Sequence, residues 1–164
     1  MADAGSGARL IEFALTDQFG RKHRRAEYAG AVTVLVGTDR GGSVHVGGWL
    51  ELARGELEGL AADGRLRALG VADLRGVPRV LRPAVRKALA AALAQPVLLD
   101  WEGRFATAYG FAPGACTVLV ADARGRVVHR TGGAAADPAL VAELVRCVRA
   151  LLAAAPERGA GPRP

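Results

Sequence analysis

Apolar residues divide the first quarter of the chain into short extended segments. Residues 10–15 alternate apolar and polar positions, Asp17 to Gly20 has the composition of a turn, and residues 21–25 are polar. This pattern predicts an N-terminal β-hairpin. The run Ala31 to Gly37 (AVTVLVG) is continuous and rich in β-branched residues, which is typical of a strand buried on both faces of a sheet. We expect it to be the central strand.

Further along, helical and extended patterns alternate. The predicted elements are a helix over 49–64, a strand over 66–74, a helix over 79–94 with Pro83 in its first turn, a strand over 96–100, a small helix over 102–109, an antiparallel hairpin of 117–121 and 126–130, and a last helix over 138–154. Strands that alternate with helices pair in parallel through right-handed crossovers, while the late hairpin adds antiparallel strands. The sequence therefore predicts an α/β fold, a mixed sheet between two layers of helices.

Composition and charge narrow the class of protein. A chain of 164 residues has the length of one domain, which we place at residues 9–154, after a flexible start over 1–8 and before a disordered tail over 155–164 rich in Pro, Gly and Arg. No signal peptide or membrane span is recognisable, so a cytoplasmic location is expected. The net charge of +6 permits binding of anions, but it speaks first to solubility.

Three stretches resemble a known family. They are Phe13 to Gly20 (FALTDQFG), Val32 to Val36 (VTVLV), and Tyr109 through Val127, which ends in DARGRV. With the order of elements, they resemble the redoxin branch of the thioredoxin superfamily, which includes peroxiredoxins and membrane-tethered thiol reductases. The resemblance implies a thioredoxin-like three-layer sandwich. It also implies a reactive cysteine in the loop after the central strand, where a helix N-terminus stabilises the thiolate.

That loop, Gly37 to Gly48, contains no cysteine. On the family pattern Gly42 and His45 fall near the two cysteine positions, so conventional peroxidase or disulfide-reductase chemistry is not expected there. Three interpretations stay open: His45 as a general base or ligand, an anion site made by the glycine-rich backbone with Arg40, and a connection that has lost its role. The candidate binding residues of the loop are Thr38, Asp39, Arg40, Gly42, Ser43 and His45. No cofactor or metal is expected.

The two cysteines, Cys116 and Cys147, are too few for a disulfide framework. The resemblance places Cys116 at or next to the position where thioredoxin-like proteins hold a cis-proline, opposite Gly42 and His45. Cys116 is therefore the candidate catalytic residue of an atypical oxidoreductase, or else a small buried apolar residue. Cys147 is expected to pack in the last helix, although a disulfide between the two stays open.

Two further sets of residues are candidates for binding. The aromatic residues that can line a pocket, or can equally well pack in the core, are Trp49, Trp101 and Tyr109. The predicted basic helix carries a cationic face opposite its leucines, which can meet an anionic lipid surface or an acidic partner, or can simply be solvated. Its members are Arg75, Arg79, Arg82, Arg86 and Lys87. No aromatic platform or helix-turn-helix pattern accompanies the charge, so no specific binding of nucleic acid is expected.

The sequence thus favours a redoxin-like domain that acts as a binding module for a protein or a small anionic ligand. The first alternative is a thiol oxidoreductase or redox sensor that uses Cys116 alone. The second is an adaptor that docks anionic surfaces through the helix with Arg75 to Lys87. Oligomeric state stays open, a homodimer included.

Overall fold

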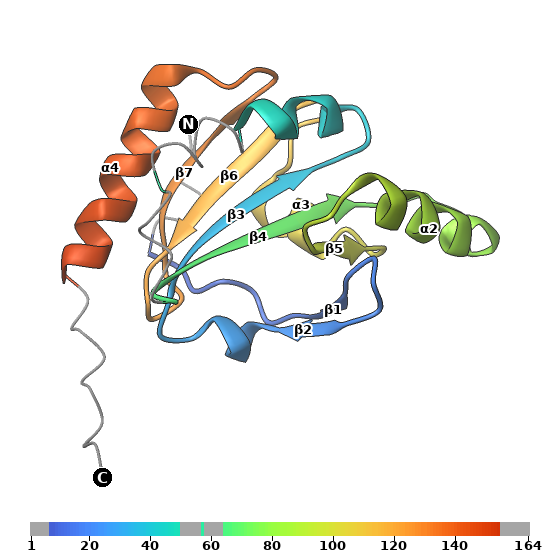
Figure 1. Cartoon of the computed structure of the whole chain (residues 1–164), viewed down its shortest axis with the longest axis horizontal. Helices are drawn as coiled ribbons and strands as arrows, with labels where there is room; N and C mark the ends of the chain where they lie inside the picture. The colour runs from blue at the N-terminus through green and yellow to red at the C-terminus, as the bar shows by residue number, and fades with distance from the viewer. Residues whose placement is uncertain (1–6, 50–56, 58–63, 155–164) are drawn as a thin grey trace, which may run out of the picture.

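The computed structural model describes residues 7–49, 57 and 64–154, and Figure 1 shows their arrangement. The elements are β1 (Ala14–Thr16), β2 (Lys22–Arg24), η1 (Arg25–Tyr28), β3 (Val32–Thr38), η2 (Gly42–His45), β4 (Leu66–Asp73), η3 (Arg79–Leu81), α2 (Arg82–Ala92), β5 (Val97–Asp100), α3 (Arg104–Tyr109), β6 (Cys116–Ala121), β7 (Val127–Gly133) and α4 (Pro138–Ala154). The predicted N-terminal hairpin, late hairpin and last helix are all present.

A five-stranded sheet with the order β5-β4-β3-β6-β7 forms the centre of the molecule. β3 pairs in parallel with β4 and antiparallel with β6, β4 pairs in parallel with β5, and β6 pairs antiparallel with β7. All seven residues of β3 are buried. The mixed sheet and its central strand are therefore as predicted, and β1 with β2 forms a separate two-stranded sheet.

The two faces of the sheet carry two hydrophobic clusters. Val34 and Val36 of β3 point into one cluster, which contains the buried face of α4, and Leu35 points into the other, with Phe13 and Phe105. Successive strand residues alternate between faces, so the same strand supplies both clusters. In Figure 1, α4 lies along β7 on one side, whereas α3 and the β1–β2 hairpin lie on the other.

Helix α2 is little covered by the other described elements. The predicted helix over 79–94 is divided into η3 and α2, with Pro83 in the first turn of α2 as expected, and no residue of either is buried. In Figure 1, α2 extends away from the sheet beyond the end of β4. Gln18 ties it to the hairpin, because its side-chain amide donates to the carbonyl oxygens of Leu93 (3.2 Å) and Gln95 (2.7 Å).

Two further segments flank or interrupt the described elements. Gly7 and Ala8 are paired with the first residue of β7: the Gly7 N–H donates to the Val127 carbonyl and the Val127 N–H donates to the Ala8 carbonyl. The helix expected over 49–64 lies mostly outside the described residues, although residues 46–49 are helical. No helix in the described ranges is both long and apolar enough to cross a lipid bilayer.

Candidate functional site

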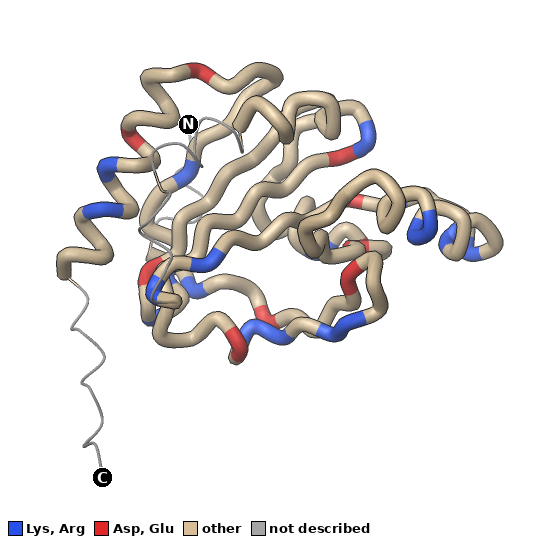
Figure 2. Tube along the Cα trace, in the orientation of Figure 1, with Lys and Arg blue, Asp and Glu red and all other residues tan. Residues whose placement is uncertain are grey.

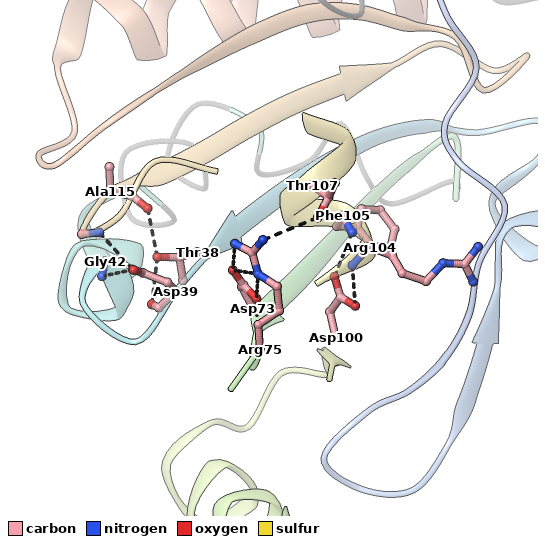
Figure 3. A network of polar contacts seen from close by, with 11 residues as sticks. Thr38, Asp39, Gly42, Asp73, Arg75, Asp100, Arg104, Phe105, Thr107 and Ala115 are labelled. Atoms are coloured by element: carbon pink, nitrogen blue, oxygen red, sulfur yellow. Dashed lines mark hydrogen bonds and ion pairs between the residues drawn. The ribbon is translucent and has the colours of Figure 1, made fainter. Parts of the chain in front are cut away.

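The loop after β3 is held in place by Asp39 and Thr38 (Figure 3). Oδ1 of Asp39 accepts hydrogen bonds from the backbone N–H groups of Gly42 (2.7 Å) and Gly114 (3.1 Å). The Thr38 hydroxyl donates to the carbonyl oxygen of Ala115 at 3.1 Å. Two buried or half-buried polar side chains thus join this loop to the segment before β6, and their hydrogen-bonding capacity is used by the fold itself.

Gly42, at the predicted position of the first family cysteine, is buried and has no room for a side chain. A Cβ at this position would overlap with Thr38 Oγ1 and would lie 2.5 Å from the carbonyl oxygen of Ala115. Contacts this short are repulsive, and the second atom belongs to the backbone. The loop is therefore built around the absence of a side chain at this position.

Cys116 lies opposite Gly42, as the sequence predicted, at the start of β6. Its thiol is 3.6 Å from the Gly42 carbonyl oxygen, to which it can donate. The residue is 2% exposed, and burial raises the pKa of the thiol above its ordinary value of 9.0. A reactive cysteine needs access and a lowered pKa. Cys116 has neither, and Cys147 in α4 is also a free thiol whose pKa is raised by burial.

The other predicted loop residues lie at the surface. Arg40 and Ser43 are exposed and His45 is half-buried. The Ser43 hydroxyl donates to the Arg40 carbonyl at 2.7 Å, within the turn that begins η2. Val44 between them is 78% exposed. These residues therefore form an outward-facing corner, whereas Thr38, Asp39 and Gly42 support it from beneath.

Carboxylates also stand at the ends of the next two parallel strands, and each has a structural partner (Figure 3). Asp73, the last residue of β4, binds the Arg75 guanidinium through both carboxylate oxygens at 2.8 to 3.1 Å. Asp100, the last residue of β5, accepts the backbone N–H groups of Arg104 (3.0 Å) and Phe105 (2.8 Å). Carboxyl ends of parallel strands are the usual place for a ligand site. Here, however, both carboxylates are engaged in hydrogen bonds within the protein.

The structure does not bring the three candidate aromatic residues into one pocket. Trp49 is buried in the cluster under α4, and Tyr109 is buried in the cluster on the opposite face of the sheet. The Tyr109 hydroxyl accepts the Ile11 N–H at 2.9 Å. Trp101 is half-buried beneath the guanidinium of Arg82, whose carbon lies 5.0 Å from the ring centroid.

The predicted cationic face of α2 is only partly available. Arg82 pairs with Glu102 (3.6 Å) in addition to its contact with Trp101, and Arg86 donates to the Gln18 carbonyl at 3.1 Å. Arg75 is held by Asp73. Arg79 and Lys87 remain as exposed cations, and Figure 2 shows the basic positions along α2. The apolar side chains of this region, Val80 (82% exposed) and Leu81 (50%), face solvent as well.

A series of hydrogen-bonded side chains in the hairpin was not predicted from the sequence. His23 Nε2 lies 2.8 Å from Asp17 Oδ2, and His23 Nδ1 lies 3.0 Å from the Tyr28 hydroxyl. Burial alone would raise the pKa of Asp17, but hydrogen bonds from His23 and from the backbone of Arg21 and Phe19 outweigh it and lower that pKa. The available signal was the pair of polar residues, Asp17 and His23, on facing arms of the hairpin.

Comparison with solved structures places this architecture among known folds. The chain is similar to a protein described as a thiol:disulfide interchange protein DsbE from Chlorobium tepidum, with a TM-score of 0.64 and 19% identity over 93% of this chain and 99% of that one. It is similar to peroxidoxin BcpB from Mycobacterium tuberculosis, with a TM-score of 0.61 and 21% identity over 90% of this chain and 97% of that one. It is also similar to BsSco, a member of the Sco family of cytochrome c oxidase assembly proteins, with a TM-score of 0.65 and 13% identity over 91% of this chain and 96% of that one.

The chain therefore has a thioredoxin-like α/β fold, as its sequence predicted. No protein-family model matches the sequence, and no curated protein matches it either. The neighbours establish the architecture alone.

Proposed function

We propose that this chain is a thioredoxin-like binding module that works without thiol chemistry. The observation that carries the proposal is the packing of Gly42 against Thr38 and Ala115, at the position where the resemblance implies a cysteine. The buried thiol of Cys116 supports it further. The proposal includes the cytoplasmic location expected from the sequence, where two free cysteines stay reduced.

The proposed binding surface is the outward corner of the Gly37 to Gly48 loop. It presents a cation at Arg40, an exposed apolar side chain at Val44 and a half-buried imidazole at His45. The exposed Arg40 guanidinium forms no hydrogen bond or ion pair with other described residues, so its charge is available to a partner. A protein segment with acidic and apolar side chains fits this combination best.

Binding is tested with one defined probe, a hexapeptide of alternating Glu and Leu, by titration calorimetry. Arg40→Gln and Val44→Ser are each expected to weaken binding at least fivefold. Arg126→Gln is the matched control, since it removes an equally exposed cation in the turn at the other end of β6, and it should change the dissociation constant less than twofold. Equal binding by the wild type and both loop variants would overturn the assignment of this surface.

Absence of thiol chemistry is tested separately. The wild type and Cys116→Ser are compared for peroxide consumption and for reduction of a protein disulfide with a dithiol as the electron source. We expect neither protein to exceed the rate of the uncatalysed reaction. Turnover by the wild type that Cys116→Ser abolishes would instead establish the alternative, an oxidoreductase that uses Cys116 alone.

A second candidate role is docking on an anionic surface through η3 and α2. The observation that favours it is the exposure of Val80 and Leu81 beside the exposed cation Arg79, because a basic and apolar surface helix can lie at a membrane interface. Sedimentation with vesicles of phosphatidylglycerol should be lost in the double variant Val80→Ser/Leu81→Ser and kept in Val44→Ser, which removes an apolar side chain elsewhere. Equal sedimentation with phosphatidylcholine vesicles would exclude this role.

A further inference from the structure

A small cavity opens at the end of the sheet opposite the Gly37 to Gly48 loop. Its volume is about 170 Å³, and it is enclosed by the N-terminal segment, η1, the first residues of β3 and the turn between β6 and β7. Drug-sized ligands occupy pockets of about 300–1,000 Å³. This cavity therefore suits a much smaller molecule or one functional group of a larger molecule. Its polar lining consists of Arg9, Glu12, Arg25, Tyr28, Thr33 and Arg124.

The lining carries an excess of positive charge. The lining contains three arginines and only one carboxylate, that of Glu12. This carboxylate already forms an ion pair with Arg25 at 2.6 Å. Arg25 also donates to the Leu10 carbonyl at 2.9 Å, which holds its guanidinium at the wall of the cavity. The guanidinium groups of Arg9 and Arg124 are exposed and form no hydrogen bond or ion pair within the described part of the chain. Two guanidinium groups thus remain without a counter-charge from those residues beside the same cavity.

The backbone keeps these two arginines next to each other although they are far apart in sequence. Arg9 pairs with Arg126 in an isolated β-bridge, and the Leu10 N–H donates to the Gly125 carbonyl at 2.8 Å. The turn that carries Arg124 is closed by Asp122, whose carboxylate accepts the backbone N–H groups of Arg124 (2.8 Å) and Arg126 (2.9 Å). Hydrogen-bonded backbone therefore fixes where these two arginines leave the chain, side by side at the cavity.

We propose that this cavity is a binding site for a small oxyanion of the phosphate class, contacted by Arg9 and Arg124 and flanked by Arg25. Guanidinium groups bind phosphate through paired, charge-assisted hydrogen bonds. Thr33 of β3 also lines the cavity. Free phosphate and a phosphoryl group on a larger molecule share this chemistry. The cavity is separate from the loop at the other end of the sheet.

Titration calorimetry with inorganic phosphate, at constant ionic strength in a buffer without phosphate, tests the site. We expect binding by the wild type, and at least a tenfold weaker dissociation constant in Arg9→Gln/Arg124→Gln. Arg126→Gln is the matched control: it removes one exposed cation from the same turn but not from the cavity lining, and it should shift the constant less than twofold. Thermal unfolding without phosphate shows that each variant is folded.

Phosphoserine is the second probe in the same experiment. Binding of phosphoserine as tight as that of phosphate, and lost in the same double variant, assigns the site to a phosphoryl group presented by a larger molecule. Binding of phosphate alone assigns it to the free ion. Absence of binding by both probes, or equal weakening in Arg126→Gln and in the double variant, overturns the proposal. Neither result bears on the binding surface proposed at the Gly37 to Gly48 loop, which is tested with a different probe.

Discussion

Gly42 is a position where a single methyl group meets both a side chain and the backbone. Gly42→Ala places its Cβ 2.5 Å from the Ala115 carbonyl oxygen, and overpacking of this kind costs about 1–3 kcal/mol. Gly47→Ala is the control, because a Cβ at that position has nothing within 4 Å and alanine favours the helical backbone there. We expect urea unfolding to show a loss for the first variant and no loss for the second. Equal stability of both would contradict the packing at Gly42.

Asp17 makes stability depend on pH in the acid range. Its pKa is lowered in the folded protein, so folding favours the carboxylate. The gain is complete above the ordinary carboxyl pKa and is lost as pH falls through the lower pKa of the folded state. Asp17→Asn should therefore reduce the free energy of unfolding at pH 7 by about 1–3 kcal/mol and flatten its decline between about pH 5 and pH 3.

Urea unfolding at a series of pH values measures this decline. Glu102→Gln is the control, because Glu102 is 72% exposed and has one long ion pair with Arg82. Its profile should follow that of the wild type. A decline in Asp17→Asn as steep as in the wild type would show that other carboxyl groups are responsible.

Asp100 controls the start of one element, α3. Its fully buried carboxylate accepts two backbone N–H groups of the first turn, those of Arg104 and Phe105. Asp100→Ala leaves the buried Phe105 N–H without a partner, at a cost of about 1–3 kcal/mol, and also removes the part-buried bond to Arg104. Asp137→Ala removes one exposed hydrogen bond at the start of α4 and should cost about 0.5–1 kcal/mol. Thermal unfolding compares the two, and a cost at Asp137 as large as at Asp100 would argue against this role.

The elements themselves were largely readable from the sequence. Period-two and continuous apolar patterns located the strands, and the apolar spacing of 138–154 located α4. The pattern of α2 predicted a helix but not its exposure, since amphipathicity specifies which face is apolar and not what covers it. The hydrogen bonds of Asp39, Asp100 and His23 could not be predicted from the sequence for a related reason. Each of these side chains meets a backbone or side-chain partner that only the folded chain brings near.

At the scale of the whole molecule, the thiol of Cys116 reports on global opening. The residue starts a strand in the centre of the sheet and is 2% exposed, so in a Cys147→Ser background we expect a thiol reagent to label it only in unfolded molecules. Val148→Ala in α4, at a fully buried site, should destabilise by about 2 kcal/mol and accelerate labelling about thirtyfold. Labelling that is fast and indifferent to Val148→Ala would show that Cys116 is accessible in the folded state.

The position of the candidate site was predictable only in outline. The resemblance placed Cys116 opposite Gly42, and the structure has them in contact. The cavity with Arg9 and Arg124 could not be predicted from the sequence, because these residues are separated by more than a hundred positions. Only the pairing of the N-terminal segment with the turn before β7 brings them together.

Gln18 acts as a mechanical joint in this molecule. Its side chain holds the end of α2, and its Oε1 accepts the Val97 N–H at 2.8 Å, at the start of β5. The preceding residue, Asp17, begins the chain through His23 to Tyr28, which lies at the wall of the cavity. A load applied to α2 by a partner would thus pass into the hairpin through the Gln18 amide and through the hydrogen bond from Arg86 to the Gln18 carbonyl, and along the hairpin to the opposite end of the sheet.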